Sequence, residues 1–205
     1  SGKISPAEAL RFGIVLSVLG VGWAMWIDRL YGLIVFGGLF FDVAIYTICL
    51  KRRSAWSILW GGISGGMPVL AGRALGIGYL DWVGITLFLA VLFWIPTHIL
   101  TFAMKYNKDY QRAGVPTVPN QYGFKTTRVV IALSTVLAAG AMILSAYGIG
   151  MAWGYLRLLG VLSLGLFALA VFSLVKPSEK LNFGLFKYAS LYMLGSMLIM
   201  MVEVI

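Results

Sequence analysis

Two basic segments of this chain carry side chains suited to chemistry on a phosphate-bearing substrate. The first is Lys51-Arg52-Arg53; the second is the run Lys105–Arg112, which mixes cations, hydrogen-bonding groups and one carboxylate, Asp109. Lysine and arginine hold phosphate oxygens, and a carboxylate among them can share a magnesium ion with a diphosphate. Taken alone, Lys51-Arg52-Arg53 is more simply a stop-transfer anchor. Together, the two segments favour an anion site.

The elements that must position these side chains are membrane helices. Of the 205 residues, 60% are hydrophobic and 11% are charged, about half the charged share of a soluble protein. The mean hydropathy is +0.93. A single cysteine, Cys49, excludes a disulfide framework. We therefore expect an all-α polytopic membrane bundle that forms one domain over residues 1–205, and no nucleic-acid module.

Seven apolar stretches approach the roughly 20 residues that cross a bilayer. They cover residues 8–26, 31–50, 57–75, 81–104, 127–147, 150–175 and 184–204. The third stretch is the weakest, because it contains Gly61–Gly66 and Pro68. A kinked helix packed by small residues explains it. A glycine face that admits a flat or polyprenyl ligand explains it equally well.

Positive charges orient the chain. If the seven stretches alternate across the membrane, thirteen of the 16 lysines and arginines fall on one face and only Arg29, Arg73 and Arg157 on the other. Under the positive-inside rule the crowded face is cytoplasmic. We expect a multi-pass protein of the cell membrane, with its N-terminus and the connection 105–126 in the cytoplasm and its C-terminus outside.

Four ordered motifs make the chain resemble the UbiA-type intramembrane prenyltransferases, closest to the protoheme IX farnesyltransferase branch. The opening Ser1–Ser5 resembles S-G-x-I-S, and residues 46–68 resemble YT-x-x-LKR…GG…PP. Residues 94–98 resemble W-x-P-P-H, with Thr97 in place of the second proline, and residues 109–116 resemble D-Y-x-x-A-G-V-P. The resemblance is good to about Gly123, and beyond it only the hydropathy matches.

The resemblance implies nine helices and two acidic motifs that bind magnesium and the diphosphate of an isoprenoid donor. This chain has seven stretches, as expected if it begins just after the first motif. The prenyl group would pass to an electron-rich lipophilic acceptor. Asp109 would hold the metal and take part in catalysis with Tyr46 and His98, and the diphosphate would contact Lys51, Arg52, Lys105, Asn107 and Arg112. We expect the 205 residues to bind a donor weakly, and turnover to require an acidic motif upstream of Ser1.

Several interpretations stay open. Protoheme IX, a quinone precursor, an aromatic acid and an archaeal glycerol lipid all fit as acceptor, because Lys108-Asp109 stands where the heme branch usually has paired aspartates. Tyr46 is equally well an interfacial tyrosine, and His98 alone would be a packing residue. Asp42 is an intramembrane acid with either a functional or a helix-packing role. A transporter and a non-catalytic assembly protein are the alternatives from other classes.

Overall fold

The computed structural model describes residues 3–204, so Ser1 and Gly2 of the opening motif lie outside the described residues. The described part contains helices and no strand, which confirms the all-α expectation. In chain order its elements are α1 (Pro6–Ile27), α2 (Arg29–Phe40), the π-helix η1 (Phe41–Leu50), α3 (Ser57–Ile77), α4 (Trp82–Lys105), α5 (Asn107–Arg112), α6 (Val118–Gly148), α7 (Trp153–Val175) and α8 (Glu179–Val204).

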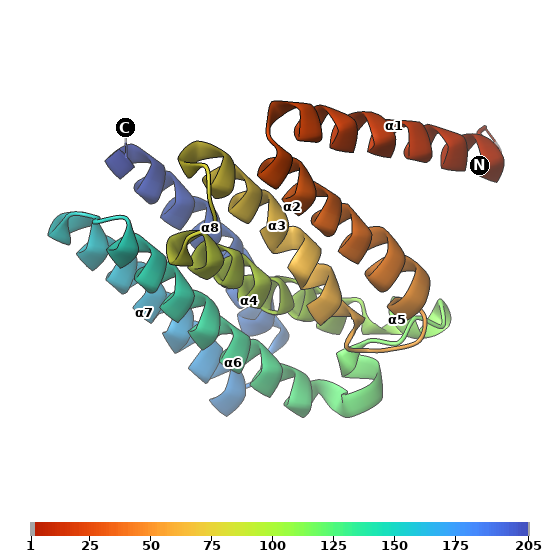
Figure 1. The fold of residues 1–205 in the computed structure, drawn as a ribbon. Helices are drawn as coiled ribbons and strands as arrows, with labels where there is room; N and C mark the ends of the chain where they lie inside the picture. The colour runs from red at the N-terminus through yellow and green to blue at the C-terminus, as the bar shows by residue number, and fades with distance from the viewer. Residues whose placement is uncertain (1–2, 205) are drawn as a thin grey trace.

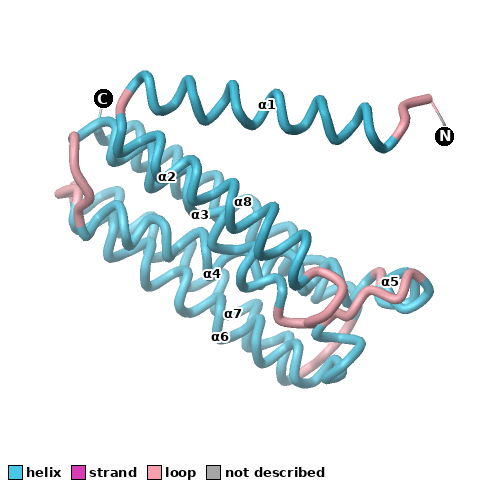
Figure 2. The backbone as a smooth tube through the Cα atoms, turned by 45° about the vertical axis from the view of Figure 1, so that its right-hand side comes forward, coloured by secondary structure: helices cyan, strands magenta, loops and turns pink. Residues whose placement is uncertain are grey.

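Four helices, α4, α6, α7 and α8, close into a bundle that holds most of the core. Ile131, Met142, Leu159, Leu166 and Tyr192 are each at most 2% exposed. On the other side of α4 the remaining long helices form a row, because α3 packs on α4, α2 on α3 and α1 on α2 (Figure 1). Figure 1 and Figure 2 both show α1 running away from the bundle towards its N-terminal end.

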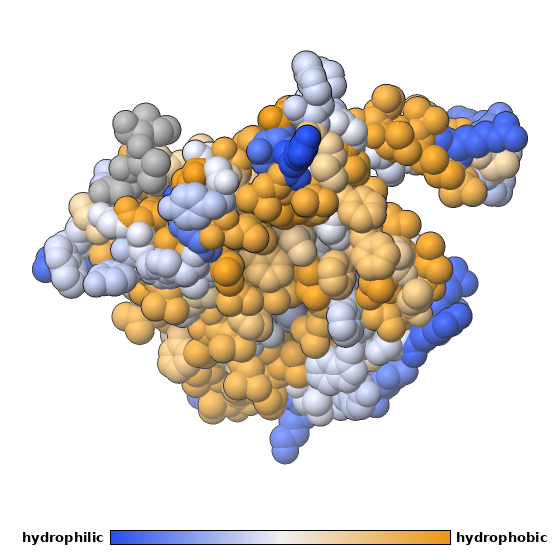
Figure 3. Space-filling model, in the orientation of Figure 1, coloured by the Kyte–Doolittle hydropathy of each residue, from blue (hydrophilic) through white to orange (hydrophobic). Residues whose placement is uncertain are grey.

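The outer surface of the bundle is largely apolar, as expected for a protein that faces lipid (Figure 3). Within the described residues, six helical segments are long and apolar enough to cross a membrane: α1, α2 continued by η1, α4, α6, α7 and α8. All seven expected stretches form long helices, but α3 does not reach the same hydropathy, because glycines, Pro68 and Arg73 interrupt its apolar sequence. The chain is a multi-pass integral membrane protein.

The glycine-rich part of α3 brings two helices into close contact. A Cβ atom added at Gly66 would lie 2.8 Å from the carbonyl oxygen of Phe88, and one at Gly62 would lie 2.9 Å from Leu92 Cδ1. A Cβ at Gly65 would also collide with Ile95 Cδ1. Gly62, Gly65 and Gly66 therefore serve close packing against α4.

The connection between α4 and α6 is held by its own hydrogen bonds, as its turn-rich sequence predicts. The Val115 N–H donates to the Tyr110 carbonyl at 3.1 Å, and Asn120 Nδ2 donates to the Val115 carbonyl at 3.3 Å. Gly114 has φ +65°, a conformation that favours glycine. The helix α6 begins earlier than the expected stretch 127–147, and its first turn is set off by Gly123, at φ 76° and ψ 169°.

Candidate functional site

The end of the second spanning helix places Tyr46 and Lys51 together. In an α-helix, residues five apart point about 140° away from each other. Here the segment is a π-helix, and the Lys51 N–H donates to the Tyr46 carbonyl at 2.7 Å. Lys51 Nζ lies 5.6 Å from the centroid of the Tyr46 ring. The ring lies against α3, where a Cβ added at Gly61 would be 3.2 Å from it.

Tyr46 and Lys51 line a cavity of about 240 Å³ between the α3 start, the α4 end and the α5–α6 connection. Tyr110, Val115 and Pro116 close it on the side of the connection. Apolar side chains complete the lining, among them Ile58, Ile99 and Leu100. The cavity thus combines one cation and two phenol rings with an apolar wall.

Arg52 and Arg53 extend the basic lining to an adjoining hollow. They share it with Tyr110, Pro116 and Asn120 of the connection. The structure therefore brings the segment 51–53 against the segment 110–116, but none of the cations of the predicted second segment, Lys105–Arg112, lines either space. Tyr110 lines both spaces, although its motif directed attention to Asp109. Asp109 and Tyr110 are consecutive residues of a helix, so their side chains point about 100° apart.

Asp109 and Arg112 lie on the outer side of the short helix α5. Their side chains form an ion pair at 3.8 Å and are 67% and 81% exposed. Neither lines the Tyr46–Lys51 cavity or the adjoining hollow. Across residues 3–204, no cluster of three or more histidine, cysteine, aspartate or glutamate side chains could hold a metal ion.

Lys105 and Asn107 are not part of the same lining. Lys105 Nζ lies 4.0 Å from the centroid of the Phe183 ring, so this cation turns towards α8. Asn107 is half-buried, and its Oδ1 atom is buried without a hydrogen-bond partner. Of the five residues expected to hold the diphosphate, the structure thus places Lys51 and Arg52 side by side and the others apart from them.

His98 faces α8. Its ring stacks between Trp94 and Phe186, with centroid distances of 4.7 and 4.5 Å. Nδ1 lies 3.0 Å from Ser190 Oγ, and the Ser190 hydroxyl donates to the Phe186 carbonyl at 2.9 Å. With the Ser190 hydroxyl proton on the Phe186 carbonyl, Nδ1 would be the donor to Ser190 and Nε2 would carry the lone pair.

Asp42 lies in η1 beside α3. Its Oδ1 atom is 3.5 Å from Ser64 Oγ, which donates at 2.8 Å to the Gly61 carbonyl instead. Asp42 also lines a space between α2 and α3 with Gly38, Met67 and Pro68.

Comparison with known proteins decides the family of this fold and motif set. The model of the UbiA prenyltransferase family matches residues 1–191. The chain belongs to the UbiA prenyltransferase family. It is therefore a membrane prenyltransferase, and the matched region continues well past Gly123, where the sequence motifs end.

Relatives within the UbiA family match nearly the whole chain. Protoheme IX farnesyltransferase 1 of Picrophilus torridus is 37% identical, over 98% of this chain and 68% of the relative. Protoheme IX farnesyltransferase of Pyrobaculum arsenaticum is 36% identical, over 93% of this chain and 68% of the relative. A solved structure from a study of digeranylgeranylglyceryl phosphate synthase in membranes has a TM-score of 0.83 at 22% identity, covering 99% of this chain and 71% of that one. The chain spans about two thirds of the length of these curated relatives.

Proposed function

We propose that this protein transfers a prenyl group from an isoprenoid diphosphate to protoheme IX. The observation that carries the proposal is the cavity where Lys51, Tyr46 and Tyr110 meet, with Arg52 and Arg53 beside it. It offers cations for a diphosphate and an apolar wall for a hydrocarbon chain. Curated relatives named protoheme IX farnesyltransferase support the choice of acceptor.

Lys51 and Arg52 neutralise the diphosphate as it leaves. Charge builds on the diphosphate oxygens while the bond from oxygen to the prenyl C1 carbon breaks, so cations positioned there lower the barrier. The leaving diphosphate keeps the bonding electron pair, and C1 becomes part of an allylic cation. A carbon of the acceptor then forms the new bond and loses a proton.

Tyr46 stabilises the positive charge that develops on the prenyl group. Its ring already accommodates a cation on its face, since Lys51 Nζ lies 5.6 Å from the ring centroid. A diphosphate bound by Lys51 would bring the C1 carbon close to the same ring. An aromatic face attracts a cation by its quadrupole, and the attraction grows where water is excluded.

Magnesium would reach the site on the diphosphate. When bound, the ion neutralises phosphate charge and aids departure of the leaving group. Magnesium typically takes one or two protein carboxylates and completes its shell with phosphate oxygens and water. Asp109 would be such a ligand, but its exposed side chain pairs with Arg112 and lines neither the cavity nor the adjoining hollow. The described residues therefore do not form a magnesium site around the cavity.

His98 orients the acceptor. If Nδ1 donates to Ser190, Nε2 has a free lone pair, which is the form of imidazole that ligates iron. Trp94 and Phe186 hold the ring from both faces. A second partner that fixes the tautomer of a ligating histidine is a general feature of metal binding.

The test uses the protein in lipid nanodiscs with magnesium and labelled farnesyl diphosphate. Donor binding and prenyl transfer are read separately, with protoheme IX, a quinone precursor, an aromatic acid and a glycerol lipid as acceptors. We expect weak, magnesium-dependent donor binding by these 205 residues, and any transfer to go to protoheme IX in preference to the other acceptors. Transfer to a different acceptor alone would contradict the heme assignment, and no donor binding would contradict the proposed site.

A further inference from the structure

The ends of α4, α6 and α8 enclose a second polar cavity, of about 290 Å³, which the proposed donor site does not use. Three cations line it, Lys105, Arg128 and Lys180, together with one carboxylate, Glu179. Within residues 3–204 none of these four side chains forms an ion pair. The cavity therefore has an unbalanced positive charge.

Two buried polar atoms of the cavity lining have no hydrogen-bond partner among the described residues. The first is Arg128 Nε, a hydrogen-bond donor. The second is Oδ1 of Asn182, an acceptor on a residue that is only 6% exposed. The orientation of the Asn182 amide is fixed, because its Nδ2 group donates to the Thr101 carbonyl at 2.9 Å. An unpaired buried donor or acceptor costs about 1–3 kcal/mol, so both atoms point to a ligand.

The two atoms together define the chemistry of that ligand. Arg128, Lys105 and Lys180 call for an anion, whereas Asn182 Oδ1 calls for a hydrogen-bond donor on the same molecule. With three cations against one carboxylate, a neutral hydroxyl suits Asn182 better than an ammonium group. A phosphate ester that carries hydroxyl groups meets both demands.

The cavity lies where lipid headgroups lie. Lys105 ends α4 and Glu179 begins α8, so the lining belongs to the ends of spanning helices. Met104, Phe124 and Phe183 supply an apolar side to the lining, and Phe124 is 40% exposed. Basic pockets between membrane helices at this depth bind anionic lipid headgroups.

We propose that this cavity binds the headgroup of an anionic glycerophospholipid of the phosphatidylglycerol type. Arg128, Lys105 and Lys180 contact the phosphate, and Asn182 accepts a hydrogen bond from a headgroup hydroxyl. The acyl chains leave past Phe124 and Phe183 into the bilayer. The site is distinct from the one lined by Tyr46 and Lys51, and the proposal does not depend on which acceptor the enzyme prenylates.

Native mass spectrometry of the detergent-solubilised protein with added lipids tests the proposal. We expect phosphatidylglycerol to bind several-fold more tightly than phosphatidylcholine. Phosphatidylpropanol, which has the same phosphate without headgroup hydroxyls, should bind several-fold more weakly than phosphatidylglycerol. Equal binding of the phosphatidylglycerol and phosphatidylpropanol lipids would overturn the role of Asn182.

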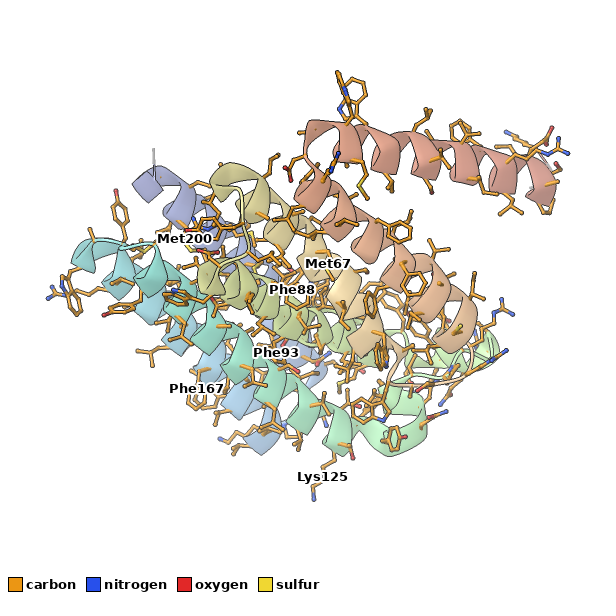
Figure 4. All side chains as sticks on the ribbon, in the orientation of Figure 1. Met67, Phe88, Phe93, Lys125, Phe167 and Met200 are labelled. Atoms are coloured by element: carbon orange, nitrogen blue, oxygen red, sulfur yellow. The ribbon has the colours of Figure 1, made fainter. Side chains whose placement is uncertain are left out.

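A pair of charge-matched double variants separates the cavity from general surface charge. Arg128→Gln with Lys180→Gln should weaken phosphatidylglycerol binding at least tenfold. Lys125→Gln with Lys176→Gln removes the same charge from exposed positions, and Lys125 projects away from the bundle (Figure 4). This control should stay within twofold of the unchanged protein. Equal losses in the two double variants would overturn the proposal.

Competition identifies the source of the phosphate. Millimolar inorganic phosphate should leave phosphatidylglycerol bound, and displacement by it would show a free-phosphate site instead. Farnesyl diphosphate at concentrations that fill the donor site should also leave the lipid bound. Displacement by farnesyl diphosphate would show that Lys105 and Arg128 belong to the donor site. Loss of prenyl transfer with unchanged lipid binding would count only against the proposed function.

Discussion

At the scale of single residues, Lys51 and Arg52 are the cations that the structure places beside the cavity. We expect Lys51→Gln and Arg52→Gln each to weaken diphosphate binding by about 1.5–3 kcal/mol, roughly 10- to 150-fold, the usual cost of losing a hydrogen bond to a charged group. Competition against labelled farnesyl diphosphate measures the effect. Lys125→Gln, which removes one charge from an exposed position, is the control. Unchanged affinity in both variants would leave Lys51-Arg52-Arg53 as a membrane anchor only.

Ser190 contacts His98 Nδ1 at 3.0 Å and is the candidate for fixing the tautomer of that ring. The Ser190→Ala variant lacks the hydroxyl that contacts Nδ1. The imidazole of His98 then loses its preference for the tautomer that is protonated on Nδ1 and has a lone pair on Nε2. Outer partners of this kind typically change metal affinity 10- to 100-fold. We expect the affinity for protoheme IX to fall about tenfold and the affinity for the donor to stay unchanged. The heme absorption band measures protoheme binding. A fall in donor affinity of the same size would indicate a general structural role.

Asp81 stabilises the connection between α3 and α4 by hydrogen bonds, at the end of the bundle opposite Lys51 and Arg52. It accepts from Arg73 Nη2 at 2.8 Å and from the Gly84 N–H at 2.8 Å. The hydrogen bond with Arg73 holds the pKa of Asp81 below its ordinary value of 3.8. A lowered pKa stabilises the fold at a pH above the ordinary value, and this stability is lost as the pH falls through the lowered pKa.

We therefore expect the thermal unfolding midpoint in detergent to fall as the pH is taken from 6 towards 3, and the fall to be smaller in Asp81→Asn. Asparagine keeps the capping contact with Gly84 and removes the titration. At pH 6 the variant should itself be less stable, because the ion pair with Arg73 is gone. An identical pH response in the two proteins would exclude Asp81 as the titrating group.

At the scale of elements, the close contact between α3 and α4 depends on glycine. Gly66→Ala would put a methyl group 2.8 Å from a backbone oxygen of Phe88, which cannot move aside cheaply. We expect a loss of about 1–3 kcal/mol, the usual cost of overpacking, seen as a lower unfolding midpoint. Gly72→Ala on the same helix has open space around the new Cβ and serves as the control. Equal stability of the two variants would contradict the packing role.

The sequence predicted which segments are helices, but it could not predict the hydrogen-bond register of one of them. Hydropathy marks residues 31–50 as a spanning helix whether the backbone bonds run to the fourth or the fifth residue. The π-register of η1 brings Tyr46 and Lys51 together, and it was visible only in the structure. The neighbours of His98 were not predictable either, because α4 contacts α3, α6 and α8 and the sequence does not say which of them His98 faces.

At the scale of the whole molecule, the predicted site residues lie at one end of the helices. The motifs alone did not predict that these residues form two separate groups at that end. The anion site was predicted as one cluster of cations around Asp109. The structure separates two groups, because α4 ends between them: Lys51 and Arg52 lie towards α3, and Lys105 lies towards α8. The spacing of the motifs along the chain predicts at which end of the bundle a site residue lies. On which side of α4 it lies depends on helix packing, which the spacing does not predict.

The side of the membrane on which that end lies follows from charge. Thirteen of the 16 lysines and arginines fall on the face that carries Lys51 and Lys108, and such an excess remains in the cytoplasm. Cysteine labelling in intact cells tests it, in a background where the exposed Cys49 is replaced by serine. We expect Lys108→Cys to resist an impermeant reagent, and Tyr147→Cys, at a position 71% exposed, to react from outside. Labelling of position 108 from outside would reverse the topology and place donor binding on the other side of the membrane.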